Sequence, residues 1–148
     1  MIETATTADL DRVVELWVAL VEAGRADGVH LRAERNRTEA RRQLAEAAAE
    51  RRVLVARERQ IVGFASVAVR HGRFESDATR GRIENLYVVP GRRGEGIGSD
   101  LLSAATERLA EFGADIVVVQ TPAENEAARR FYRNWGFEPH RIELERRL

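Results

Sequence analysis

The stretch IENLYVVPGRRGEGIG, residues 83–98, decides the fold. Residues 83–89 are rich in β-forming side chains and predict a strand, which Pro90 ends because proline cannot donate to a strand ladder. A glycine-rich loop then leads into an apolar stripe at helical spacing, which Gly113 ends: Ile97, Leu101, Leu102, Ala105, Leu109 and Phe112. The apolar run 115–120 predicts a buried strand parallel to the first, so this region forms a βαβ unit.

The flanking segments extend this unit into a mixed sheet. A short N-terminal strand precedes two helices, the first beginning at a Thr6–Asp9 capping box and the second covering about residues 38–51. Runs 53–56 and 61–69, joined by a tight turn, predict a hairpin. Residues 70–82 predict a loop, 125–135 a helix and 137–145 a last strand. The expected order is β-α-α-β-β-β-α-β-α-β, an α/β (α+β) fold with a mixed sheet.

Composition excludes several chemistries. The 148 residues carry 24 basic and 24 acidic side chains, so no net charge attracts nucleic acid or an anionic membrane. There is no cysteine, hence no disulfide or thiolate nucleophile. There is also no lysine, which excludes a Walker A loop and Schiff-base catalysis. No apolar run approaches the about 20 residues of a membrane span, and no signal peptide is evident, so we expect a cytoplasmic protein.

The glycine-rich loop predicts a phosphate site. It joins a strand to a helix N-terminus, where free backbone N–H groups and the helix dipole favour an anion. The arginine fork of Arg93 is suited to phosphate. The loop is not a Rossmann fingerprint, because Ser99 and Leu101 stand where a third glycine would be. A connection whose glycines bind nothing is the alternative.

A second motif reads N-x-x-A-x-x-x-Y-x-x-x-G-F from Asn125 to Phe137. On a helix, Asn125, Ala128 and Tyr132 share one face, whereas Ala127, Phe131 and Trp135 lie on another and are expected to anchor the core. An amide, a minimal side chain and a phenol on one face suit a ligand lying along the helix.

Together these motifs resemble the GNAT superfamily of N-acetyltransferases. The matching segments are 83–90, 92–98 and 125–137, in the family's order. The resemblance implies a single N-acetyltransferase domain over 1–148, with helices on both faces of a mostly antiparallel sheet and a central βαβ unit. It implies acetyl-CoA as donor, held by the backbone of Leu86, Tyr87 and Val88, by the pyrophosphate loop, and by Asn125 and Tyr132. The expected loop residues are Arg93, Gly94, Gly96, Ile97, Gly98 and Ser99.

Without cysteine, the expected route is direct attack by an amine on the bound thioester, with a backbone N–H near Val88 as oxyanion donor. Tyr132 is the expected acid, since a phenol with a pKa of about 10 stays protonated at neutral pH. The general base stays open between Glu84, a loop histidine (His30 or His71) and water. Strand alternation predicts that Glu84 shares a face with Leu86 and Val88.

We therefore expect an acetyl-CoA-dependent N-acetyltransferase that acts on a primary amine of a small molecule. A protein or peptide amine is the alternative acceptor, and a non-catalytic acyl-CoA-binding regulatory module is the alternative class. No metal site is expected, because the three histidines show no ligand spacing. Nucleic acid and membrane are not expected partners, and the resemblance suggests a homodimer.

Overall fold

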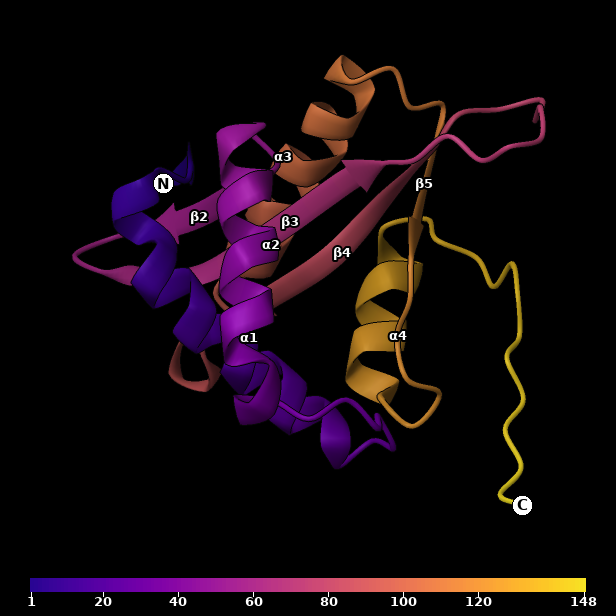
Figure 1. Ribbon diagram of the computed structural model, residues 1–148, viewed down its shortest axis with the longest axis horizontal. Coiled ribbons are helices and arrows are strands. Elements are labelled where there is room, and N and C mark those ends of the chain that lie inside the picture. Colours follow the sequence, from indigo (N-terminus) through magenta and orange to yellow (C-terminus); the bar gives the residue numbers. More distant parts are fainter.

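Five strands form one sheet in the order β1-β2-β3-β4-β5, in a computed structural model that describes all 148 residues (Figure 1). The strands are β1 (Ile2–Thr4), β2 (Val53–Arg57), β3 (Ile61–Val69), β4 (Arg80–Val88) and β5 (Ile116–Val119). The first four pair antiparallel, and β5 pairs parallel to β4. The mixed, mostly antiparallel sheet is confirmed, and its βαβ unit ends at the edge strand β5.

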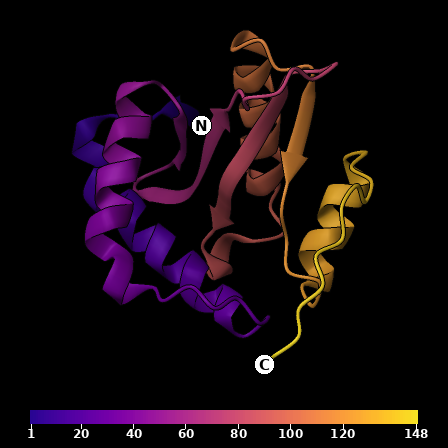
Figure 2. The same cartoon turned by 45° about the vertical axis from the view of Figure 1, so that its right-hand side comes forward.

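Helices cover both faces of the sheet (Figure 2). One face carries α1 (Leu10–Arg25) and α2 (Arg37–Ala49), and the other carries α3 (Ile97–Glu111). The helix α4 (Glu126–Asn134) lies beside β5. Short 3-10 turns occupy Thr7–Asp9, Glu34–Asn36 and Pro90–Arg92, and the predicted Thr6–Asp9 capping box is present. No helix is sufficiently long and apolar to span a bilayer.

The alternation of β3 builds a core on each face. Phe64 is fully buried against the α1 and α2 layer, together with Val13 and Val55. Its neighbour Ala65 points the opposite way and packs with Leu101 of α3. Successive side chains of a strand point to opposite faces, so one continuous apolar strand serves both cores.

The predicted last strand, residues 137–145, is wrong. No strand follows α4, and residues 138–148 are all exposed. Phe137 is the last residue whose backbone N–H is bonded within the chain, to Tyr132 O at 3.1 Å. An alternating segment becomes a strand only where a neighbouring strand accepts its hydrogen bonds, and this tail meets none in its own chain.

Gly63 gives a direct test of this packing. A Cβ built there would stand 2.8 Å from the backbone oxygen of Tyr87 and 3.1 Å from Leu101. We expect Gly63→Ala to lower the free energy of unfolding by about 1–3 kcal/mol through overpacking. Denaturant titration measures this, with Gly72→Ala as the matched control because nothing lies within 4 Å of a Cβ at that position. Equal midpoints for the two variants would contradict the packing described.

Candidate active site

The pairing between the strands β4 and β5 ends halfway along β4. Their pairing runs from Arg80–Ile116 to Ile83–Val119 and then stops, although β4 continues to Val88. The same part of β4 remains paired with β3. The sheet therefore has a gap beside the second half of β4, where one edge of that strand has no partner.

Leu86 and Val88 present their backbone groups to this gap. The N–H of Val89 donates to Val62 O of the β3 side at 2.9 Å. Backbone direction alternates along a strand, so Tyr87 also faces β3, whereas Leu86 and Val88 face away from it. The backbone groups of Leu86 and the N–H of Val88 thus have no partner in the sheet, whereas Val88 O accepts from Arg93 Nε at 2.9 Å. The backbone groups of Tyr87 face β3.

The loop after β4 exposes a row of backbone donors. Gly94 and Gly96 have φ of 80° and 88°, a left-handed conformation that favours glycine, and Gly96 is the residue before α3. From Gly94 to Ser99 no backbone N–H has an acceptor within the chain. Glu95, which was not among the predicted loop residues, adds its N–H to this row. Successive free N–H groups at a helix N-terminus form an anion site.

The side chains of the two loop arginines both make contacts within the chain. Arg93 Nε donates to Val88 O at 2.9 Å, and its guanidinium lies 5.3 Å from the centroid of the Tyr87 ring. Its Nε is thereby engaged, and its two NH₂ groups have no hydrogen-bond partner in the chain. Arg92 bonds both oxygens of Glu58 at 2.7 and 2.8 Å and also pairs with Glu95, which raises the pKa of Arg92. This clamp joins the loop to the turn between β2 and β3.

Asn125 caps α4. Its side-chain oxygen accepts from the N–H of Ala128 at 3.0 Å. This bond explains the N-x-x-A spacing as a helix start and leaves the amide NH₂ of Asn125 without a partner in the chain. A contact from Asn125 to a ligand therefore has both amide N–H donors available.

Tyr132 lies between two aromatic rings, with centroids 5.2 Å from Phe131 and 5.5 Å from Phe137. Burial raises the pKa of Tyr132 to about 12. Its hydroxyl has no hydrogen-bond partner in the chain and is not fully enclosed. The phenol is consequently a protonated donor without an acceptor.

The remaining face of α4 is less buried than expected. Ala127 and Trp135 are exposed, the latter by 47%, so the prediction that they anchor the core is wrong. The Trp135 indole N–H instead reaches Ser99 Oγ at 3.3 Å, and Phe131 touches the position of Gly98. These contacts hold α4 against the start of α3.

A register shift changes the direction of Glu84. Ser66 pairs with Asn85 and Val67 with Ile83, so Glu84 has no partner on β3. Its carboxylate lies 3.4 Å from Arg70 and is 29% exposed. Since Arg70 lines a hollow with residues of α2, Glu84 points toward the α1 and α2 layer. Leu86 and Val88 pack on the α3 side, so the predicted shared face is wrong, and the bulge is the cause.

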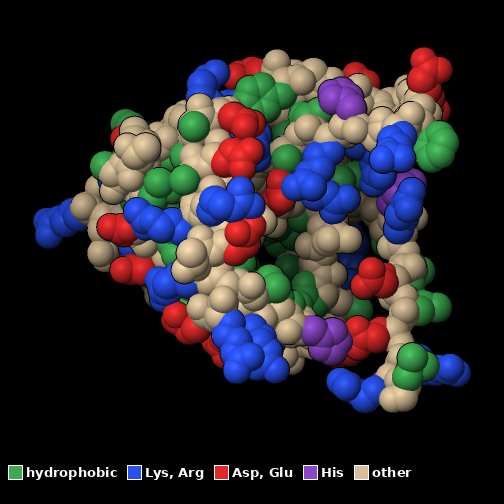
Figure 3. Space-filling model, in the orientation of Figure 1, with side chains coloured by type: hydrophobic (Ala, Val, Ile, Leu, Met, Phe, Trp, Pro, Cys, Tyr) green, Lys and Arg blue, Asp and Glu red, His purple; other side chains and the backbone are tan.

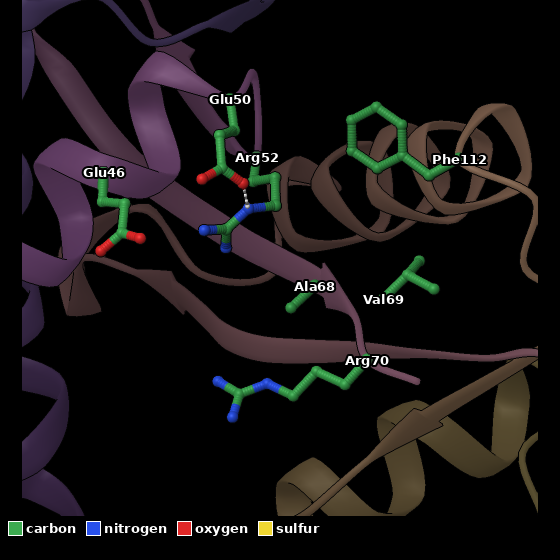
Figure 4. A pocket seen from close by; sticks show the side chains of 7 residues that line it. All are labelled: Glu46, Glu50, Arg52, Ala68, Val69, Arg70 and Phe112. Atoms are coloured by element: carbon green, nitrogen blue, oxygen red, sulfur yellow. Dashed lines mark hydrogen bonds and ion pairs between the residues drawn. The ribbon is translucent and has the colours of Figure 1, made fainter. Parts of the chain in front are cut away.

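That hollow, shown in Figure 4, has a volume of about 470 Å³. It lies between the end of α2, the end of β3 and Phe112 at the end of α3, away from the glycine-rich loop. Its acidic and basic side chains are partly paired, Arg52 Nε with Glu50 at 2.9 Å. It is therefore separate from the β4–β5 gap.

The histidines are spread over the surface. His30 Nε2 contacts both carboxylate oxygens of Glu145 in the tail at 2.9 Å. His71 and His140 are exposed and have no hydrogen-bond partner in the chain. No group of three or more His, Asp or Glu side chains is arranged to hold a metal ion. Figure 3 shows a hollow between the layer of α1 and α2 and the part of the molecule that carries α4, rimmed by charges of both signs.

This chain belongs to the acetyltransferase (GNAT) family, whose family model matches residues 14–137. N-alpha-acetyltransferase 30 of Schizosaccharomyces pombe is 40% identical over 58 residues, 39% of this chain and 39% of that protein. Aminoalkylphosphonate N-acetyltransferase of Salmonella typhimurium is 34% identical over 68 residues, 46% of this chain and 44% of that protein. The matched segment thus spans less than half of the length of these curated relatives.

The fold is shared along the whole chain with a solved structure. A tetramutant of the BH1408 protein from Bacillus halodurans superposes with a TM-score of 0.86 at 23% identity, covering 100% of this chain and 99% of that one. At this identity the likeness concerns the fold, and it confirms the predicted fold class.

The phenol of Tyr132 should lose its proton at a higher pH than an ordinary tyrosine. In an absorbance titration at alkaline pH, the difference between the native chain and Tyr132→Phe should have its midpoint near pH 12. The folded-state pKa lies above the ordinary 10.0, so the native state keeps this proton longer than the unfolded chain. This contribution to stability is complete below pH 10 and is lost as the pH rises toward 12. A midpoint near 10 would show that the ring is not desolvated.

The left-handed backbone of Gly96 should control anion binding. An L-residue there costs about 1–2 kcal/mol, so Gly96→Ala should weaken acetyl-CoA binding roughly tenfold by displacing the row of N–H groups. Isothermal titration calorimetry measures the Kd. Gly91→Ala is the matched control, because Gly91 lies in the same loop without a positive φ and with open space around its Cα. Equal affinities of the two variants for acetyl-CoA would show that the conformation of this loop does not control binding.

Proposed function

We propose that residues 1–148 form one domain that transfers the acetyl group of acetyl-CoA to a primary amine. The observation that carries this proposal is the row of free N–H groups from Gly94 to Ser99 beside an unpaired strand edge. The row of N–H groups can bind a diphosphate. The unpaired strand edge can pair with an extended arm that contains amide groups. Membership of the acetyltransferase family supports the same donor.

The residues fit acetyl-CoA part by part. The amides of residues 94–99 would hold the pyrophosphate, with no lysine or arginine fork required. Leu86 and Val88 would pair with the pantetheine arm as a neighbouring strand would. The free NH₂ of Asn125 would donate to a carbonyl of that arm, and Tyr132 would lie near the sulfur.

When bound, acetyl-CoA supplies an activated acyl group with a thiolate leaving group. The unpaired N–H of Val88 donates to the carbonyl oxygen, where negative charge develops during attack. The carboxylate of Glu84 takes a proton from the amine, directly or through water. Tyr132 donates its O–H to the leaving sulfur. Because burial makes Tyr132 a weaker acid, its stabilising hydrogen bond matters more than complete proton transfer.

A small molecule is the proposed acceptor. The Salmonella relative is named for a small aminoalkylphosphonate. The Schizosaccharomyces relative is named for an N-alpha amine, and a peptide N-terminus is therefore the second candidate.

Activity is tested by CoA release from acetyl-CoA with a panel of small primary amines and a matched panel of peptides. We expect release with small amines, and Tyr132→Phe should lower kcat roughly tenfold or more with little change in the Kd for acetyl-CoA. Glu84→Gln should lower kcat and remove the acidic limb of the pH profile if Glu84 is the base.

Three other outcomes have distinct meanings. Release with peptides alone would favour the second acceptor class. Acetyl-CoA binding without release to any amine would favour a non-catalytic acyl-CoA-binding module. Unchanged turnover of Tyr132→Phe would remove Tyr132 as the acid while leaving the activity itself in place.

A further inference from the structure

Arg82 lies half-buried in the middle of the sheet, and its guanidinium has no counter-ion. The residue stands opposite Ala68 of β3 and beside Val118 of β5, and both of these neighbours are apolar. Glu84, the only carboxylate of β4, pairs with Arg70 at 3.4 Å, and no ion pair or hydrogen bond engages the side chain of Arg82. Charged groups that are partly withdrawn from water are ordinarily paired, so this guanidinium is available to an anion from outside the chain.

The neighbours of Arg82 in β4 place its side chain on the face of the sheet that carries α1 and α2. A Cβ built at Gly81 would stand 2.8 Å from Leu109 of α3, so Gly81 faces α3. Ile83, on the other side of Arg82, packs in the α3 core. Successive strand residues point to opposite faces, so Arg82 points away from α3. Because α1 and α2 lie over β2 and β3 and leave the same face of β5 uncovered, a ligand can approach Arg82 from this side (Figure 1).

Positive charge exceeds negative charge on this part of the sheet. By the same alternation Arg80 shares the face of Arg82, and its side chain likewise has no ion pair. Arg70 follows the end of β3 and is 77% exposed. Glu84 is the only acidic residue of β3, β4 and β5. Figure 3 shows basic side chains gathered where β3 ends and β4 begins.

The acidic side chains that line a hollow together with Arg70 are already paired elsewhere. Glu50 bonds Arg52 at 2.9 Å, and Glu46 lies 3.7 Å from Arg42 in the same helix. In Figure 4 the side chain of Arg70 lies apart from the pair of Glu50 and Arg52. These acids of α2 and its end therefore do not compensate the charge of Arg70.

The position of Arg82 along β4 suits one end of a small acceptor. Strand residues advance about 3.3 Å each, so the Cα of Arg82 stands about 13 Å from that of Leu86, which faces the unpaired strand edge. Glu84, the proposed base, lies between them and contacts Arg70. A molecule of a few bonds on this face can thus hold its amine near Glu84 and an anionic group near Arg82 and Arg70.

We propose that the acceptor is a small primary amine that also carries an anionic group, a carboxylate or a phosphoryl group, bound by Arg82 and Arg70. Either anion offers two oxygens to the parallel N–H donors of a guanidinium. In the transfer, the neutral amine nitrogen bonds to the acetyl carbon and the carbon–sulfur bond of acetyl-CoA breaks. The proton that the amine loses is balanced by the one that the CoA thiol gains, and the anionic group does not react. This inference rests on the proposed function, since it names the acceptor class of that transfer.

Matched acceptors test the proposal through their kcat/KM for CoA release. The set is an aminoalkylcarboxylate, an aminoalkylphosphonate and the amino alcohol with the same carbon chain. We expect an anionic acceptor to be preferred to the alcohol roughly tenfold or more, and the first two arms show which anion is favoured. The preference should lie mainly in KM, because the anionic group contributes binding and takes no part in the chemistry.

Arg82→Gln should lower the anionic-to-neutral ratio of kcat/KM roughly tenfold with little change in the Kd for acetyl-CoA. Arg82→Lys keeps the charge without the planar fork and should restore part of the ratio. Arg73→Gln is the matched control, because Arg73 is an exposed arginine of the loop between β3 and β4, and the ratio should survive it. Circular dichroism verifies that each variant is folded.

Equal kcat/KM for anionic and neutral acceptors would overturn the inference and leave the acetyl transfer in place. A preference that survives both Arg82→Gln and Arg70→Gln would also overturn it. If no amine releases CoA, the proposed function fails, and calorimetric titration of an alkylphosphonate without an amine, in the presence of CoA, tests the anion site alone. Arg82→Gln should then weaken that binding roughly tenfold relative to Arg73→Gln, and equal binding by the two variants would exclude the site.

Discussion

Parallel pairing between β4 and β5 ends at Ile83 and Val119, and the site depends on that termination. If the two strands stayed paired to Val88, Leu86 and Val88 would bond to β5 and have nothing to offer a ligand. β3 stays paired with β4 beyond this point, as far as Gly63 with Val88, so the exposed edge remains part of the sheet. The gap is therefore a consequence of backbone pairing in the sheet, and no individual side chain creates it.

The glycine-rich loop works at the same location because β4 leads directly into it. Positive φ at Gly94 and Gly96 turns successive N–H groups outward, and α3 begins before those groups acquire acceptors. Backbone thus supplies both parts of the cradle, the unpaired edge and the row of donors. In the proposed function, a chain without lysine would hold the diphosphate chiefly through these backbone donors.

The sequence predicted the elements that rest on local patterns. The hairpin of β2 and β3, the stripe of α3 and the glycine loop follow from periodicity and backbone preference, and the structure confirms them. The orientation of Glu84 could not be predicted, because the bulge opposite Ser66 and Val67 depends on pairing between distant strands. The contacts of Arg93 with Val88 O and with the Tyr87 ring were not predicted either, although both partners precede it closely in the chain. The tail alternates like a strand, but no other strand of the chain pairs with it, so the pattern alone does not form one.

The ion-pair clamp of Arg92 with Glu58 and Glu95 has a kinetic consequence. It fastens the start of the glycine-rich loop to the turn between the paired strands β2 and β3. The loop is therefore preorganised: its conformational freedom is surrendered during folding and not again at each encounter with a ligand. An incoming diphosphate should meet donors already aligned, so association would be governed by diffusion and orientation and not by rearrangement of the loop.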